Sequence, residues 1–112
     1  MKPNVEIQEL KLGDGIAVER GFAVVVRYIG RLRRGDVFAS WEAYGQPARF
    51  VIGQRRIVAG LEYGIVGMRV GGARRITVPP HLGYREKGLA DIVPPNAIMI
   101  FDVELLEAHA PK

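Results

Sequence analysis

The chain carries few side chains that could do covalent or metal-dependent chemistry. Ser40 and Thr77 are its only serine and threonine, His81 and His109 are its only histidines, and it has no cysteine. A cysteine nucleophile, a disulfide scaffold and a cysteine-ligated zinc site are therefore excluded. No acid–nucleophile pair accompanies His81, so we expect a surface histidine there and not a general base. We expect neither a metal site nor a cofactor, because two distant histidines and scattered acids do not supply a ligand set.

The charge balance is basic. Lys and Arg together number 16, twelve of them arginine, against 12 acids, and the net charge is +4. Such a surface permits contact with nucleic acid or with an acidic partner. Nucleic-acid surfaces usually add exposed aromatic residues for stacking, whereas most aromatic residues here have expected core or pocket roles. We therefore expect arginines scattered over a solvated surface, and we do not expect a nucleic-acid partner.

The length of 112 residues suits one domain, 1–112. No apolar run approaches the ~20 residues that a membrane span needs. Residues 1–6 reach no apolar signal core before charges interrupt it. We expect a cytoplasmic monomer that makes no contact with a membrane, and a frayed tail at residues 107–112.

Alternation and β-branched residues predict a chain made mostly of strands. Residues 22–29 give a strong strand signal that ends at Gly30. The last strand, 98–106, is the clearest, because apolar residues at 99, 101, 103 and 105 alternate with acids at 102 and 104. Further strands are expected at 5–12, 37–38, 48–52 and 73–78, with a polar hairpin loop at 31–36.

The only helical candidate is the segment 57–66. Val58, Leu61 and Ile65 share one face of it, and Glu62 falls on the other side. Gly60 and Gly64 each weaken an isolated helix by about 1 kcal/mol relative to alanine, so this helix needs packing to form. Residues 79–96 follow as a long irregular flap, which in a small domain is usually functional. The order predicts an α+β fold, with an antiparallel sheet laid against a single helix.

Eight segments, in one order from about residue 12 to residue 106, resemble the FKBP-type peptidyl-prolyl isomerases, the macrolide-binding immunophilins. Each segment alone is weak evidence, whereas all of them in register are strong evidence. The resemblance implies a strongly curved, five- to six-stranded antiparallel half-barrel wrapped around one short helix. The segments are 26–30 (VRYIG), 35–38 (GDVF), 50–53 (FVIG), 57–64 (IVAGLEYG), 68–72 (MRVGG), 78–84 (VPPHLGY), 92–97 (IVPPNA) and 101–106 (FDVELL).

The resemblance also implies rotation of Xaa-Pro peptide bonds in proline-containing polypeptides, as a help to protein folding. The barrier to this rotation is amide resonance, about 18–20 kcal/mol, and uncatalysed exchange takes on the order of tens of seconds. An apolar aromatic cup can hold the proline ring, and a backbone N–H can fix a substrate carbonyl. Such catalysis needs no nucleophile, metal or nucleotide, which suits a sequence so short of them.

Six positions match the family's catalytic residues. Tyr28 and Phe38 match the aromatic wall, and Phe101 matches its deeper side. Ile57 and Val58 match the pair before the helix, where the Val58 N–H would bind the substrate carbonyl. Tyr84 matches a flap tyrosine whose hydroxyl donates a hydrogen bond to the ligand.

Four further positions match residues that contact the substrate, and three of them depart from the family pattern. Val93 is a conservative counterpart of a flap aliphatic residue, and Leu61 replaces the usual tryptophan floor. Ala39 stands where the family usually has an aspartate, and Ala48 where an aromatic residue commonly closes the cup. These losses predict reduced activity and weak macrolide binding, although Trp41 or Tyr44 could lean in from the neighbouring loop.

Two other functions stay open at this point. The first is an FKBP-fold module that binds peptides or acts as a chaperone with little catalysis, which turnover of a short proline peptide would distinguish from an enzyme. The second is a basic domain bound to nucleic acid or ribosomes, whose binding would fall steeply as salt rises.

Overall fold

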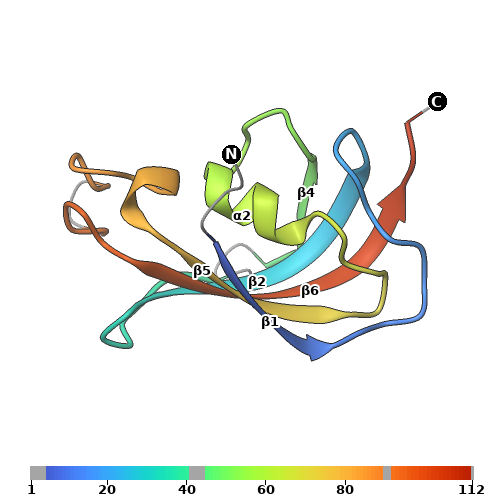
Figure 1. Cartoon of the computed structure of the whole chain (residues 1–112), viewed down its shortest axis with the longest axis horizontal. Coiled ribbons are helices and arrows are strands. Elements are labelled where there is room, and N and C mark those ends of the chain that lie inside the picture. The colour runs from blue at the N-terminus through green and yellow to red at the C-terminus, as the bar shows by residue number, and fades with distance from the viewer. Residues whose placement is uncertain (1–4, 41–44, 90–91, 112) are drawn as a thin grey trace.

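The computed structural model describes residues 5–40, 45–89 and 92–111. These residues form a six-stranded sheet, one α-helix and one 3-10 helix (Figure 1). The predicted α+β class, a curved antiparallel sheet around a short helix, is confirmed. The elements are β1 (Glu6–Lys11), β2 (Ala23–Leu32), β3 (Val37–Ser40), β4 (Ala48–Val51), α2 (Ala59–Ile65), β5 (Ala73–Val78), η1 (Pro80–Leu82) and β6 (Met99–His109).

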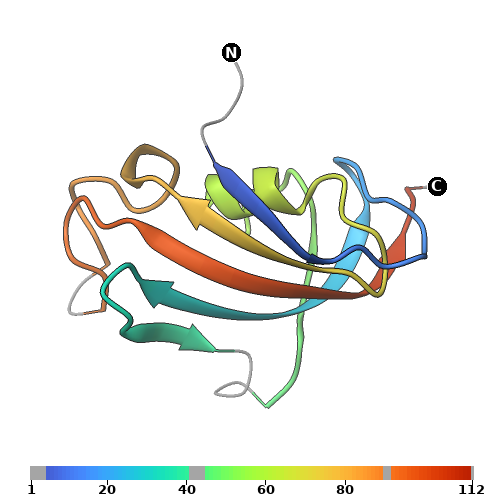
Figure 2. The same cartoon turned by 60° about the horizontal axis from the view of Figure 1, so that its bottom comes forward.

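The two longest strands, β2 and β6, form the middle of the sheet. Its order is β1–β5–β6–β2–β3, with β4 also paired to β2, and every pair is antiparallel. Because β6 occupies one edge of β2 along its whole length, β3 and β4 share the other edge, at residues 29–31 and 23–26. The long strands curve around α2, which lies on the concave face (Figures 1 and 2).

The core lies between this concave face and α2. Alternation along β6 turns residues 99, 101, 103 and 105 inward, each at most 3% exposed, as the pattern predicted. Leu61 and Ile65 of α2 meet them at 2% and 0% exposure. The partners from the other strands are Val24 and Val26 of β2 and Ile76 and Val78 of β5.

The helix is shorter than the predicted segment 57–66 and packs unusually close to the sheet. Val58 has extended backbone, with φ −60° and ψ 145°, so α2 begins only at Ala59. A Cβ on Gly60 would lie 2.5 Å from Val78 Cγ1, and one on Gly64 would lie 2.4 Å from Ile76 Cγ2. The glycines that weaken an isolated helix are therefore what allows α2 to touch β5.

Two strand ends differ from the prediction. Gly30 does not end β2, which continues to Leu32 with Gly30 opposite Phe101. The tail is not frayed at residues 107–109, because β6 continues to His109, which pairs with Ala23. The start of β2 thereby gains a partner for backbone groups that would otherwise need one.

Candidate functional site

Three aromatic side chains, predicted as the pocket wall, meet on the concave side of the sheet. The Phe101 ring lies 6.1 Å from the Tyr28 ring and 5.7 Å from the Phe38 ring, with interplanar angles of 60° and 81°. Such edge-to-face contacts add about 0.5–1.5 kcal/mol each beyond burial. Phe101 is only 3% exposed, whereas Tyr28 and Phe38 are half-buried. Phe101 is therefore the buried member of this three-ring cluster, which we call the aromatic cup, and Tyr28 and Phe38 flank it at partial exposure.

Gly30 makes this ring cluster possible, a role that the sequence analysis missed. A Cβ at Gly30 would lie 2.8 Å from Phe101 Cε1 and 2.9 Å from Phe38 Cζ. Both distances are well below van der Waals contact, so any side chain here would push the two rings apart. The sequence signal is a glycine that follows a β-branched run, because a glycine within a strand often marks a close approach of another group to the backbone.

The segment that leads into α2 supplies the other side of the site. Ile57 and Val58 are half-buried and pack against the core, and Leu61 is buried within it. The Val58 carbonyl accepts hydrogen bonds from the N–H groups of Leu61 and Glu62, at 3.1 and 3.3 Å. The Val58 N–H donates to no group in the described part of the chain. It can therefore donate to a ligand carbonyl.

Glu62 holds the loop before this segment, which the sequence analysis also missed. We expected it on the polar side of the helix, but it is 3% exposed. Its Oε2 accepts hydrogen bonds from the N–H groups of Gly53, at 2.8 Å, and of Arg55, at 3.3 Å. Arg55 has a φ of 60°, and its guanidinium lies 5.5 Å from the centroid of the Tyr63 ring. The sequence signal was a lone acid in a seven-residue helix that is otherwise without charge.

The flap between β5 and β6 carries the two remaining predicted contacts. Val93 is 1% exposed and lies in the core, and Tyr84 is half-buried against it. Leu89 and Val93 exchange backbone hydrogen bonds of 2.8 and 3.1 Å and so form an isolated antiparallel bridge within the flap. His81 is exposed on η1, as expected.

A cavity of about 440 Å³ opens beside the aromatic cup. Three predicted site residues line it: Tyr28, Ala48 and Ile57. Ala48 lies on β4 opposite Val26, where its short side chain leaves the space open. Ala39, on β3 opposite Gly30, does not line it, and Trp41 and Tyr44 lie outside the described residues. The other lining residues are Gln46, Pro47, Arg49, Phe50 and Arg56.

The structure therefore gathers the predicted residues in two adjoining groups. Tyr28 belongs to both, since its ring contacts Phe101 in the cup while the residue also lines the cavity. The predicted residues of the core, flap and helix entrance that do not line the cavity are Phe38, Phe101, Val58, Leu61, Tyr84 and Val93.

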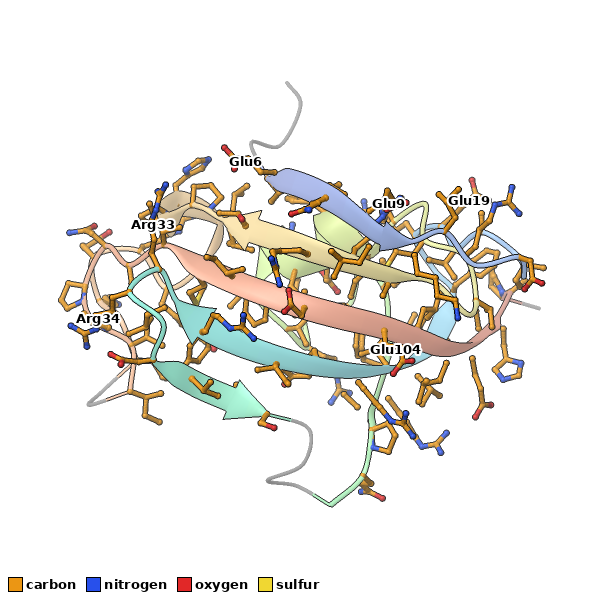
Figure 3. All side chains as sticks on the ribbon, turned by 90° about the horizontal axis from the view of Figure 1, so that it is seen from below. Glu6, Glu9, Glu19, Arg33, Arg34 and Glu104 are labelled. Carbon is orange, nitrogen blue, oxygen red and sulfur yellow. The ribbon has the colours of Figure 1, made fainter. Side chains whose placement is uncertain are left out.

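The outer face of the sheet has a smaller depression of about 160 Å³, but its charges are already paired. Arg27 pairs with Glu104 at 3.4 Å, and Figure 3 shows Glu104 on the side of the sheet away from α2. Arg75 donates to both oxygens of Asp102, at 2.7 and 3.1 Å. These hydrogen bonds hold the pKa of Asp102 below its ordinary value against the opposing effect of burial, and the nearby charge of Arg31 acts in the same direction. We infer that the ion pairs on this face stabilise the fold and do not form a binding site.

Two kinds of feature are absent from the described residues. They contain no group of three His, Asp or Glu residues that could hold a metal ion. No helix among them is long and apolar enough to cross a membrane.

Comparison with known proteins matches residues 15–106 to the family described as FKBP-type peptidyl-prolyl cis-trans isomerase. FK506-binding protein 4 of Aspergillus fumigatus is 48% identical over 103 residues, which are 92% of this chain and 21% of that protein. The 46 kDa FK506-binding nuclear protein of Spodoptera frugiperda is 37% identical over 101 residues, 90% of this chain and 24% of that protein. The chain thus spans about a fifth to a quarter of the length of these curated relatives.

Solved structures show the same architecture. The crystal structure of AtFKBP13 has a TM-score of 0.87 and 28% identity, and covers 94% of this chain and 93% of that one. The crystal structure of FkpA from Escherichia coli has a TM-score of 0.87 and 30% identity, and covers 96% of this chain and 49% of that one.

Proposed function

The chain belongs to the FKBP-type peptidyl-prolyl cis-trans isomerase family, and we propose that it catalyses the rotation of Xaa-Pro bonds in polypeptide substrates. One observation carries this proposal. The edge-to-face cluster of Tyr28, Phe38 and Phe101 forms an apolar cup on the same side of the sheet as the Val58 N–H. The matched relatives are longer proteins, so the proposal concerns this domain.

In this mechanism the proline ring packs against the aromatic rings and is thereby removed from contact with water. Amide resonance separates charge, and water stabilises that separation, so an apolar cup weakens the partial double bond. The Val58 N–H fixes a substrate carbonyl, and the Tyr84 hydroxyl donates a second hydrogen bond. Both groups position the chain on either side of the bond that turns. No proton is transferred and no covalent bond forms.

Ala39 and Ala48 reduce the activity in this proposal. The aromatic wall is open at Ala48, where the cavity of about 440 Å³ begins. A bound proline is therefore held on fewer sides, and less of the binding energy is realised in the twisted transition state. The same opening makes macrolide binding weak.

The test is exchange spectroscopy by NMR on a short proline peptide, which needs no coupled protease. We expect catalytic amounts of the domain to accelerate cis–trans exchange, and Phe38→Leu to lower the rate about tenfold by loosening the grip on the ring. Phe22→Leu is the matched control, because Phe22 is also half-buried against the core but makes no ring contact with the cup. Exchange at the uncatalysed rate with the folded wild-type domain would reject the proposal.

The open wall also favours a second candidate, a module that binds proline peptides with little catalysis. It predicts chemical-shift changes at the cup on peptide titration without faster exchange. The cytoplasmic location, the monomeric state and a role in protein folding stay predictions, and one matched relative is named as a nuclear protein.

A further inference from the structure

The arginines of this chain fall into two groups that the sequence could not separate. Seven of the twelve have a polar partner: five form ion pairs with carboxylates, and two donate to the Tyr63 hydroxyl or the Gly15 carbonyl. The guanidinium groups of the other five form no ion pair or hydrogen bond with any described residue. These five arginines are Arg20, Arg33, Arg49, Arg56 and Arg85.

Two of these unpaired arginines, Arg49 and Arg56, line the same cavity beside the aromatic cup. Arg49 lies on β4 next to Ala48, and Arg56 immediately precedes Ile57. Both are exposed, and no aspartate or glutamate is among the described residues that line the cavity. The charged residues described in the lining are therefore both cationic, and the cavity shares Tyr28 with the proposed proline site.

We propose that this cavity is a specificity subsite for the carboxylate of an acidic residue next to the proline of the substrate. This inference rests on the proposed function, because it takes the proline to occupy the cup of Tyr28, Phe38 and Phe101. Adjacent residues of an extended peptide lie about 3.3–3.6 Å apart, so a side chain flanking the proline reaches the cavity that Tyr28 and Ile57 border.

The chemistry of the lining favours a carboxylate over an apolar or neutral side chain. Guanidinium groups bind carboxylates through paired, charge-assisted hydrogen bonds, and two of them can share one carboxylate. The volume of about 440 Å³ falls within the range of small-molecule pockets, about 300–1,000 Å³. Ala48 and Phe50 supply apolar surface for the stem of a glutamate.

The test compares matched peptides whose proline is flanked by Glu or by its neutral isostere Gln, on either side: Ac-Ala-Glu-Pro-Ala-NH2 against the Gln peptide, and Ac-Ala-Pro-Glu-Ala-NH2 against its Gln peptide. Binding is measured by NMR titration of the labelled domain, and turnover by exchange spectroscopy. We expect about fivefold tighter binding of at least one Glu peptide at low salt, and a preference that falls as ionic strength rises.

The variants Arg49→Gln and Arg56→Gln assign the preference to this cavity. We expect each to reduce the Glu preference and the double variant to abolish it, while the Gln peptides bind as before. Arg33→Gln is the matched control, since Arg33 is exposed and unpaired among the described residues but lies at the β2–β3 turn (Figure 3). Its Glu preference should equal that of the wild type.

The outcomes separate this inference from the proposed function. Equal binding of the Glu and Gln peptides, or a preference that survives the double variant, overturns the subsite. A preference without faster exchange of any peptide rejects the proposed isomerase and leaves the subsite standing. If a short single-stranded RNA binds and the double variant releases it, while Glu and Gln peptides bind equally, the arginines serve a nucleic-acid surface and the inference is wrong.

Discussion

Glu62 Oε2 accepts a hydrogen bond of 2.8 Å from the backbone N–H of Gly53, although the Glu62 side chain is almost fully buried. This contact joins α2 to the loop that leads to Ile57 and Val58. The N–H of Arg55 donates to the same oxygen at 3.3 Å. One carboxylate thus fixes the loop that precedes the proposed carbonyl-binding group.

Glu62→Ala should destabilise the domain by about 2–4 kcal/mol, because it leaves two loop N–H groups without their acceptor. We expect peptide exchange to slow by more than the lost folded fraction explains, since Val58 loses its fixed position. Glu62→Gln keeps an acceptor oxygen and should recover most of both losses. Denaturant unfolding and exchange spectroscopy measure the two effects. Equal activities per folded molecule for Glu62→Ala and wild type would mean that Glu62 stabilises the fold but does not position Val58 for catalysis.

Gly30→Ala should destabilise the domain by about 1–3 kcal/mol, the usual range for added volume in a packed core. The new Cβ would meet Phe101 at 2.8 Å and Phe38 at 2.9 Å, so the rings of the cup must move. We therefore also expect a changed near-ultraviolet circular dichroism signal and a lower exchange rate. Gly35→Ala is the control, because a Cβ at Gly35 in the hairpin turn meets nothing within 4 Å, although its φ of +109° carries its own strain. An unchanged exchange rate in Gly30→Ala would mean that ring placement does not limit catalysis.

The architecture could be predicted because the alternation of apolar and polar residues in the strands is visible in the sequence. The strand β5 occupies residues 73–78 as predicted, and β6 turns the predicted alternate residues inward, because a period of two needs no knowledge of the rest of the chain. Boundaries depended on tertiary partners instead. His109 is in a strand only because Ala23 lies opposite it.

The candidate site was predictable as residue types but not as a geometry. Family resemblance named Tyr28, Phe38 and Phe101, and the structure brings their rings together. Gly30 and Glu62 were misjudged, since a glycine's close contacts and an acid's buried acceptors arise from segments distant in the sequence. The pairing of arginines could not be predicted for the same reason.

Gly64→Ala should lower stability by about 1–3 kcal/mol, even though alanine favours helix by about 1 kcal/mol. A Cβ on Gly64 would lie 2.4 Å from Ile76 Cγ2, so α2 must move away from β5. Removing these neighbouring atoms with Ile76→Ala tests this explanation, because the double variant should lose less stability than the sum of the single changes. Thermal unfolding of the four proteins measures the coupling. If the losses of stability in the two single variants add up in the double variant, contact with Ile76 is not the cause of the destabilisation by Gly64→Ala.

Asp102 should make the domain less stable in acid. Arg75 holds the pKa of Asp102 below its ordinary value through two hydrogen bonds. Because the pKa is lower in the folded state, the stabilisation is fully present above the unfolded pKa of about 3.9 and is lost as pH falls through the folded pKa. Urea unfolding between pH 7 and about pH 2 should therefore show a smaller loss for Asp102→Asn than for wild type. Glu104→Gln is the control, because its ion pair with Arg27 is exposed and screened. An identical pH profile for Asp102→Asn would contradict the assignment.

Ala48→Phe should raise the turnover of a Leu-Pro peptide by about fivefold, because a ring at this position closes the open side of the cup. Ala48 borders the cavity of about 440 Å³ together with Tyr28 and Ile57, so the added ring has space and needs no displacement of the core. Ala39→Asp, which restores a carboxylate after Phe38, should add to this gain in the double variant. Gln46→Phe is the control, since it adds the same ring to the exposed rim of the same cavity. Exchange spectroscopy measures turnover, and the ratio of Glu to Gln peptide affinities should fall because the ring takes up part of the cavity that Arg49 and Arg56 also line. Equal turnover in Ala48→Phe and wild type, with the fold intact, would show that the open wall is not what limits this domain.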